Sequence, residues 1–424
     1  MGYNEEYRMK VLYKFNNLLL VLCVFFLPIS ILFNNIFLGG FIFTSFFTMI
    51  FSNRNEFLKK LKANKKSLFF YALPFSITVF GLLYTDELKL ALDDVVRAAP
   101  FLFLPIIAIH SHQKFSKNYR NLGYSLVAGC FIVACYSWSE VMLTLKANNH
   151  SFSQFFTSRY FNHNLVKGLN LHATYVSLFV YASIGFLAHQ FKVCNSNIKK
   201  SLLLVIGALL FLFLLNLLSR NILVCFALFT TGYFVYTRKW RLFLAAALCV
   251  AVLGVISYNI KHNYLRDKLF RSLNLFEQKT QFSKKDDRFD RLEASYEIFL
   301  NKPLFGYGTA AESKHREAVF KRNKDYVAYT EKYNAHNQFF EYLSTYGLIG
   351  ATVYILFFVR LWKTVLISRK TYFVYIALAI TMLTITESIF ERTQGIVFTS
   401  FFVALVLSAE ATVKNNHERT FAIS

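Results

Sequence analysis

Residues 333–350 read YNAHNQFFEYLSTYGLIG, and the apolar run that starts in this stretch continues to about residue 360. A run of this length provides the ~20 residues that an α-helix needs to cross the hydrocarbon core of a bilayer. Comparable runs recur along the chain from about residue 15 onward. Hydrophobic residues make up 55% of the sequence and aromatic residues 18%, which is outside the range of ordinary soluble domains. The sequence therefore predicts a polytopic integral membrane protein.

The lengths and flanking charges of the apolar runs predict an all-α fold with about 12 transmembrane helices. The first run lacks a short basic segment before it and a small-residue cleavage site after it, so we expect a retained span. A large, partly helical outer loop at 260–335 separates transmembrane regions at 1–259 and 336–424. The predicted spans are 15–33, 36–52, 67–84, 93–110, 122–145, 170–190, 201–219, 221–237, 241–259, 337–360, 371–389 and 395–412.

Basic residues predict the orientation of these spans. The loops after the even-numbered runs are rich in Lys and Arg, as in NRNEFLKKLKANKK at 53–66 and TRKWR at 237–241. Such loops stay in the cytoplasm, which places both termini there. The segment 260–335 then faces outward although it is basic, because the bias is weak for loops longer than ~60 residues.

The formal net charge is +23, which would favour nucleic acid as the partner of a soluble protein. Here the charge lies in loops between apolar runs, so membrane lipids and anionic lipid-linked substrates are the predicted partners, and no nucleic acid. None of the six cysteines lies in the large hydrophilic segment, which excludes a disulfide framework there. His262 and His315 lack the spacing of metal ligands. We predict no metal and no cofactor.

One helix is predicted within the outer loop, in DRFDRLEASYEIFLNKP at 287–303. Its apolar residues Phe289, Leu292, Tyr296 and Phe299 recur at helical spacing, and Pro303 ends it. Arg288 and Arg291 lie one turn apart on this helix. A guanidinium suits bidentate binding of phosphate, although a solvated basic face explains most of the loop's cations.

His336 stands at the start of the tenth run, flanked by asparagines. Counted on a helix, Phe340, Leu343 and Gly347 share its face, and Gly347 allows a backbone or a ligand to approach closely. Imidazole takes a proton near neutral pH, so His336 is a candidate general base. The alternative is an interfacial histidine at the membrane surface.

Three other polar positions fall on the predicted outer side. Arg220 lies in a very tight turn between the seventh and eighth runs, where a guanidinium is costly unless it meets an anion or water. The alternative is a snorkelling arginine at a hairpin tip. His172 opens the sixth run and has a helix-end histidine as its alternative. Glu391 and Arg392, in ESIFERTQGIVF at 387–398 with Glu387, form either a simple turn or a polar wall of the same cavity.

Together these segments resemble the bacterial O-antigen ligase family, within the ligase/polymerase superfamily of lipid-linked glycan transferases. The resemblance covers essentially the whole chain, with a large outer loop before the third-last span. Asn221 and Ala173 depart from the glycine and proline that are common at those positions. The segments that resemble the family's motifs are LNLHATYVSLF, LLSRN, RFDRL, NKPLFGYG and HNQFFEYLSTYG.

The resemblance implies a metal-independent, inverting glycosyltransferase on the periplasmic face of the inner membrane. It would move a glycan from undecaprenyl diphosphate to a lipid A–core acceptor. By motif, His336 would be the general base, and Arg220 and Arg288 would neutralise the donor diphosphate; the motif register selects Arg288 over Arg291. The remaining candidates for substrate binding are Arg291, His172, Asn337, Gly347, Glu391 and Arg392.

Several alternatives stay open at this stage. An O-antigen polymerase uses the same donor with a second lipid-linked repeat unit as acceptor. A protein O-oligosaccharyltransferase would carry a larger outer region. A transporter or flippase would place polar residues near the bilayer midplane, often in repeated halves, whereas here they cluster at one boundary.

Overall fold

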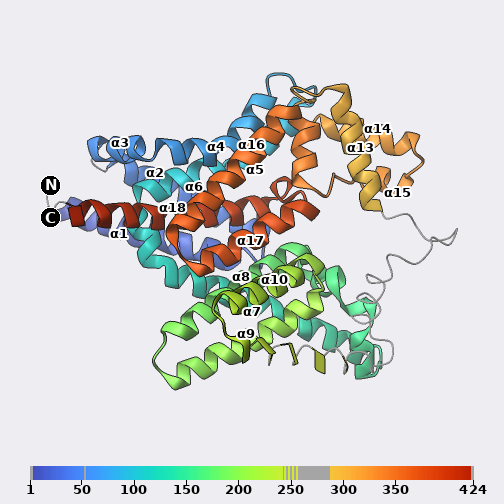
Figure 1. The fold of residues 1–424 in the computed structure, drawn as a ribbon, viewed down its shortest axis with the longest axis horizontal. Helices are drawn as coiled ribbons and strands as arrows, with labels where there is room; N and C mark the ends of the chain where they lie inside the picture. Colours follow the sequence, from blue (N-terminus) through green and yellow to red (C-terminus); the bar gives the residue numbers. More distant parts are fainter. Residues whose placement is uncertain are drawn as a thin grey trace. The chain divides into compact units, whose positions relative to one another are not determined.

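The computed structural model describes residues 3–51, 54–241 and 287–421, with scattered positions between 243 and 255. Within these ranges every regular element is helical (Figure 1), so the predicted all-α class is confirmed for the described part of the chain. The chain divides into two compact units. The first contains Met1–Leu27, Ile31–Leu122 and Lys284–Ser424, and the second contains Pro28–Ser30 and Gly123–Ser283.

Among the described residues, 7 helices are long and apolar enough to cross a membrane. Two shorter apolar helices, Arg220–Tyr236 and Thr371–Thr386, coincide with the predicted eighth and eleventh spans. The predicted ninth span at 241–259 lies largely outside the described residues, and the total of twelve stays a prediction. The long helices are Tyr7–Phe26, Ile31–Ile50, Asn118–Ala147, Ala173–Val193, Asn197–Leu217, Gln338–Ser368 and Thr393–Glu410.

The predicted fourth span at 93–110 is divided between two helices, and its crossing of the membrane stays a prediction. The chain there forms α5 (Leu88–Ala98) and α6 (Pro100–His110), each of 11 residues. Pro100 has no N–H, so the backbone hydrogen-bond pattern is interrupted at this point. A helix of that length is about 16 Å long, well short of the ~30 Å hydrocarbon core.

In the first unit, α1 (Tyr3–Phe26) packs on α2 (Ile31–Ile50), and α16 (Gln338–Ser368) packs on α4 (Lys65–Gly81). An interhelical hydrogen bond joins the two helices of each pair. The Asn16 amide donates to the Thr44 hydroxyl at 2.7 Å, and the Tyr71 hydroxyl donates to that of Thr364 at 2.7 Å. Hydrogen bonds of this kind hold helices together where no water competes. The unit also contains α3 (Arg54–Ala63), α17 (Thr371–Thr386), η5 (Ile389–Glu391) and α18 (Thr393–Phe421).

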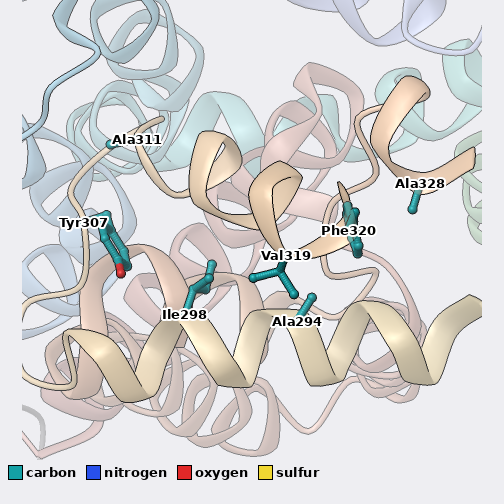
Figure 2. Packing of buried hydrophobic residues seen from close by; sticks show 7 residues of the cluster. All are labelled: Ala294, Ile298, Tyr307, Ala311, Val319, Phe320 and Ala328. Carbon is teal, nitrogen blue, oxygen red and sulfur yellow. The ribbon is translucent and has the colours of Figure 1, made fainter. Parts of the chain in front are cut away.

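The described part of the segment predicted to form an outer loop (260–335) contains three helices, which we call the outer-loop helices after that prediction: α13 (Asp287–Asn301), α14 (Glu312–Arg322) and α15 (Tyr326–Thr330). Figure 2 shows their core, in which Ala294 and Ile298 of α13 meet Val319 of α14. The predicted helix is confirmed. Two of the apolar residues whose spacing predicted it are largely exposed, Phe289 at 71% and Tyr296 at 48%, and α13 packs against α14 through Ala294 and Ile298 instead.

The second unit holds α7 (His112–Ala147) from Gly123 onward, α8 (Ala173–Val193), α9 (Asn197–Leu217) and α10 (Arg220–Tyr236). Three 3-10 helices precede α8: η1 (Phe152–Phe156), η2 (Ser158–Tyr160) and η3 (Asn162–Leu169). The Trp138 indole donates to Asn216 at 3.1 Å and links α7 to α9. Only Leu218 and Ser219 join α9 to α10, which confirms the very tight turn before Arg220.

Candidate active site

His336 lies in a turn immediately before α16 rather than on the helix. Asn337 is the N-cap, and its side-chain oxygen accepts hydrogen bonds from the backbone N–H groups of Phe339 (2.9 Å) and Phe340 (3.1 Å). The N–H of His336 donates to the Asn334 side chain at 3.1 Å, and the φ angle of His336 is +49°. The predicted helical face shared by His336 and Phe340 is therefore wrong, because the cap starts the helix after the histidine.

The imidazole of His336 is paired with a carboxylate from another turn. Its Nδ1 lies 3.1 Å from Oε2 of Glu387, which follows the last residue of α17. The two side chains are 22% and 12% exposed, so the pair is shielded and still reachable. A carboxylate at one ring nitrogen fixes the ring and leaves the other nitrogen to exchange a proton. The sequence placed Glu387 in a polar cluster but gave no signal for this pairing.

Arg291 and His336 both contact the ring of Tyr333, which lies between them in this chain of contacts. Its guanidinium carbon lies 3.7 Å from the centroid of the Tyr333 ring, and that ring lies edge-on to the His336 ring at 6.2 Å. Arg291 is only 7% exposed, so it does not belong to a solvated basic face. Arg288 lies one turn earlier in the same helix, and its side chain is outside the described residues.

Two further hydrogen bonds tie the His336 turn to the turn that carries Glu387. The Asn337 amide donates to the carbonyl of Ile385 at 2.9 Å. The side-chain oxygen of Gln338 accepts from the N–H of Phe390 at 2.6 Å. Candidate residue Asn337 thus caps α16 and links two segments that are distant in sequence.

A group of buried charges lies next to this pair of turns. Arg316 and Glu341 form an ion pair, with Nη2 and Oε1 2.6 Å apart and side chains only 2% and 1% exposed. Burial, together with the charge of Glu341, raises the pKa of the nearby Glu312 to about 7. Burial likewise raises the pKa of Glu391 well above its usual value, and the charges of Glu341 and Asp94 add to this effect. The carboxylates outnumber the cations that neutralise them here.

Gly347 is approached closely by backbone. It has φ +64° and ψ −152°, a conformation that interrupts α16. A Cβ atom at this position would lie 2.5 Å from the carbonyl of Leu304 and 2.6 Å from that of Pro303. The N–H of Leu348 donates to the Pro303 carbonyl at 2.8 Å. Because Gly347 has no side chain, the segment after α13 can pack directly against the backbone of α16. This contact fixes the outer-loop helices against α16.

The other candidate residues are spread over both units. Arg220 is the exposed first residue of α10, and His172 is the N-cap of α8, with its ring 4.3 Å from that of His163. Both belong to the second unit. Arg392 lies in the first unit and is exposed. Among the described residues, no three potential metal ligands are grouped.

An apolar groove of about 1140 Å³ lies in the first unit, between α2, α6 and α18. Its walls include Leu38, Phe46 and Phe103. Its lining also includes Arg97, whose guanidinium donates to the backbone carbonyl of Glu391 at 3.0 Å. Arg97 therefore connects the groove to the turn that follows Glu387.

Residues 203–355 match the family model described as O-antigen ligase. This match supports membership of the O-antigen ligase family. The matched segment contains Arg220, Arg288 and His336, and it ends before Glu387. A comparison with curated proteins finds no match. The match supports, at a coarse level, an enzyme of the O-antigen ligase or polymerase type, a family that suggests lipid-linked glycans as substrates.

Proposed function

We propose that this protein is an O-antigen ligase that transfers a glycan from undecaprenyl diphosphate to a lipid A–core hydroxyl. The contact between His336 and Glu387 carries the proposal. The nearby carboxylate favours the tautomer with the proton on Nδ1, which leaves Nε2 as the basic nitrogen. Nε2 takes the proton of the acceptor hydroxyl as its oxygen attacks the anomeric carbon. The bond from that carbon to the diphosphate breaks with inversion, and the diphosphate leaves as an anion.

Cations replace a general acid in this reaction. A glycosyl diphosphate needs no proton on its leaving group if positive charge is already in place when the bond breaks. Arg288 on α13 and Arg220 on α10 are assigned this role. Arg220 stands at a helix N-terminus, where unpaired N–H groups and the helix dipole also favour an anion.

The donor's polyprenyl tail would lie in the apolar groove of the first unit. The groove follows α2 from Asn35 to Ile50, which is about 22 Å of helix and comparable to much of the hydrocarbon core. Because Arg97 connects the groove to the turn after Glu387, a lipid in the groove would present its head group toward His336. We place Arg97 on the periplasmic side of the inner membrane, with both termini in the cytoplasm.

Deletion of the gene followed by analysis of surface glycan tests the acceptor. A ligase mutant accumulates long polymer on the lipid carrier and bare lipid A–core. A polymerase mutant instead leaves core that bears a single repeat unit, and this result would replace our assignment. Transfer by purified protein should also persist with chelator, and a strict need for divalent ions would contradict the arginine mechanism.

A further inference from the structure

One buried carboxylate contacts a chain neighbour of each member of the His336–Glu387 pair. Glu341 lies in the first turn of α16 and is 1% exposed. Its Oε2 accepts hydrogen bonds from the N–H of Ala335 at 2.8 Å and from the hydroxyl of Ser388 at 3.1 Å. Ala335 immediately precedes His336, and Ser388 immediately follows Glu387. Glu341 thus fixes the backbone next to the imidazole and a side chain next to its carboxylate partner.

The second oxygen of Glu341 connects this arrangement to the outer-loop helices. Oε1 accepts from Nη2 of Arg316 on α14 at 2.6 Å, and the same nitrogen reaches the Ser344 hydroxyl at 3.3 Å. Removing two such charges from water costs several kcal/mol per ion, and apolar residues of similar volume often stabilise a protein equally well. Stability alone therefore does not account for an ion pair at this position.

The bonds of Glu341 act on a strained turn. His336 has a φ of +49°, which is uncommon for residues other than glycine. Such a conformation persists only where its surroundings determine it. The bond to Ala335 holds the preceding peptide, while the N-cap at Asn337 holds the following one. Loss of the Glu341 contacts would leave the imidazole free to relax away from Glu387.

We propose that Glu341 is a positioning residue that holds His336 and Glu387 in register and couples this pair through Arg316 to the outer-loop helices. The proposal rests on the proposed function only for the role of His336 as base. The placement of the pair can be measured without substrate. The proposed role of Glu341 predicts that a substitution of Glu341 or Ser388 alters the reactivity of His336, although neither side chain touches the imidazole.

The sharpest comparison uses two buried serines that contact the same ion pair. Ser388→Ala removes the bond between Glu341 and the Glu387 turn. Ser344→Ala removes a hydroxyl that contacts Arg316 but is within α16 and away from that turn. Each full-length variant is purified in detergent and treated with diethyl pyrocarbonate, and modification of His336 is followed by peptide mass spectrometry. We expect several-fold faster modification in Ser388→Ala and the wild-type rate in Ser344→Ala.

Glycan transfer supplies a second readout. We expect kcat of Ser388→Ala to fall about 10-fold to 100-fold with KM for the donor nearly unchanged, because small misplacements of a catalytic group have costs of this size. The pH profile of kcat should also change shape in Ser388→Ala and not in Ser344→Ala. In a Glu341→Gln background the Ser388→Ala substitution should add little, since the two act through one contact.

Equal His336 modification rates in Ser388→Ala, Ser344→Ala and wild type would overturn the positioning role. So would additive losses of kcat in the double variant. If the wild type fails to transfer glycan while Ser388→Ala still exposes His336, the proposed function fails and the positioning role stands. If transfer occurs and Ser388→Ala matches Ser344→Ala in both readouts, the positioning role fails alone.

Discussion

Nδ1 of His336 lies 3.1 Å from Oε2 of Glu387, and neither residue is inside a helix. One stands in the turn before α16 and the other directly after α17. Both turns are tied together by Asn337, Gln338 and Glu341. The pair is thus defined by the ends of two packed helices, so its geometry depends on how those helices begin and end.

Replacement of Glu387 by Gln is expected to lower kcat strongly. The glutamine amide can donate to Nδ1 and would then favour the tautomer with the proton on Nε2, which cannot accept another. The expected loss is about 100-fold to 10,000-fold, the usual contribution of general base catalysis, and His336→Ala should lose at least as much. Steady-state transfer with purified protein measures both values.

His315 provides the matched control for His336. It lies on α14, with its ring 3.9 Å from that of Tyr307, and it has no assigned role. His315→Ala should retain transfer within a few-fold of wild type, with protein levels in the membrane unchanged. Wild-type transfer by His336→Ala would remove the general base from our mechanism.

We expect substitution of Arg291 to lower stability and substitution of Arg288 to lower the rate of transfer. Arg291 is buried and stacks on Tyr333, so Arg291→Ala should cost roughly 1–2 kcal/mol of stability through the lost cation–π contact. Arg288→Ala should leave the thermal unfolding midpoint unchanged and reduce kcat far more than Arg291→Ala. Thermal unfolding in detergent, combined with transfer assays, separates the two effects. If Arg291→Ala loses more kcat than Arg288→Ala, Arg291 rather than Arg288 is the arginine that corresponds to the family motif.

The sequence predicted the helices that carry the site, because long apolar runs and the proline at Pro303 are local signals. It could not predict the pairing of His336 with Glu387, since this contact depends on how α16 packs beside α17. The apolar spacing also wrongly placed His336 on the helix that follows it. The side chain of Asn337 starts the helix later than apolar spacing suggests.

The sequence also did not show which face of α13 is buried. The spacing of Phe289 and Tyr296 predicted a helix, but α13 packs against α14 through Ala294 and Ile298. Arg291 lies on that buried side because Tyr333 provides an aromatic face for its guanidinium. Composition alone does not show that a ring from a distant segment will be present.

Gly39→Trp tests the groove as the site of the donor's tail. A Cβ atom added at Gly39 meets no atom within 4 Å, and Gly39 lines the groove, so the indole should fill it without displacing a helix. Loss of contact with a few methylene groups costs more than about 1.4 kcal/mol, so KM for an undecaprenyl donor should rise at least about tenfold. A donor with a two-isoprene tail should show little change.

Gly232→Trp is the matched control for this substitution. A Cβ atom at Gly232 also meets no atom within 4 Å, but this residue lies on α10, outside the groove. Its KM values for both donors should equal those of wild type. If Gly39→Trp raises KM equally for long and short donors, the tail lies elsewhere.

Glu312→Gln should stabilise the protein at alkaline pH. Burial raises the pKa of Glu312 in the folded state to about 7 from a usual value of 4.5. Its protonated form therefore supports folding fully below pH 4.5, and this contribution is lost as the pH rises through about 7. Glutamine keeps the shape without the charge, so the gain should be nearly absent at pH 4 and reach the order of 1–3 kcal/mol at pH 8. Thermal unfolding in detergent across this range measures it, with exposed Glu293→Gln on α13 as the control. A gain that does not depend on pH, or one that Glu293→Gln reproduces, would show that the buried charge of Glu312 is not its cause.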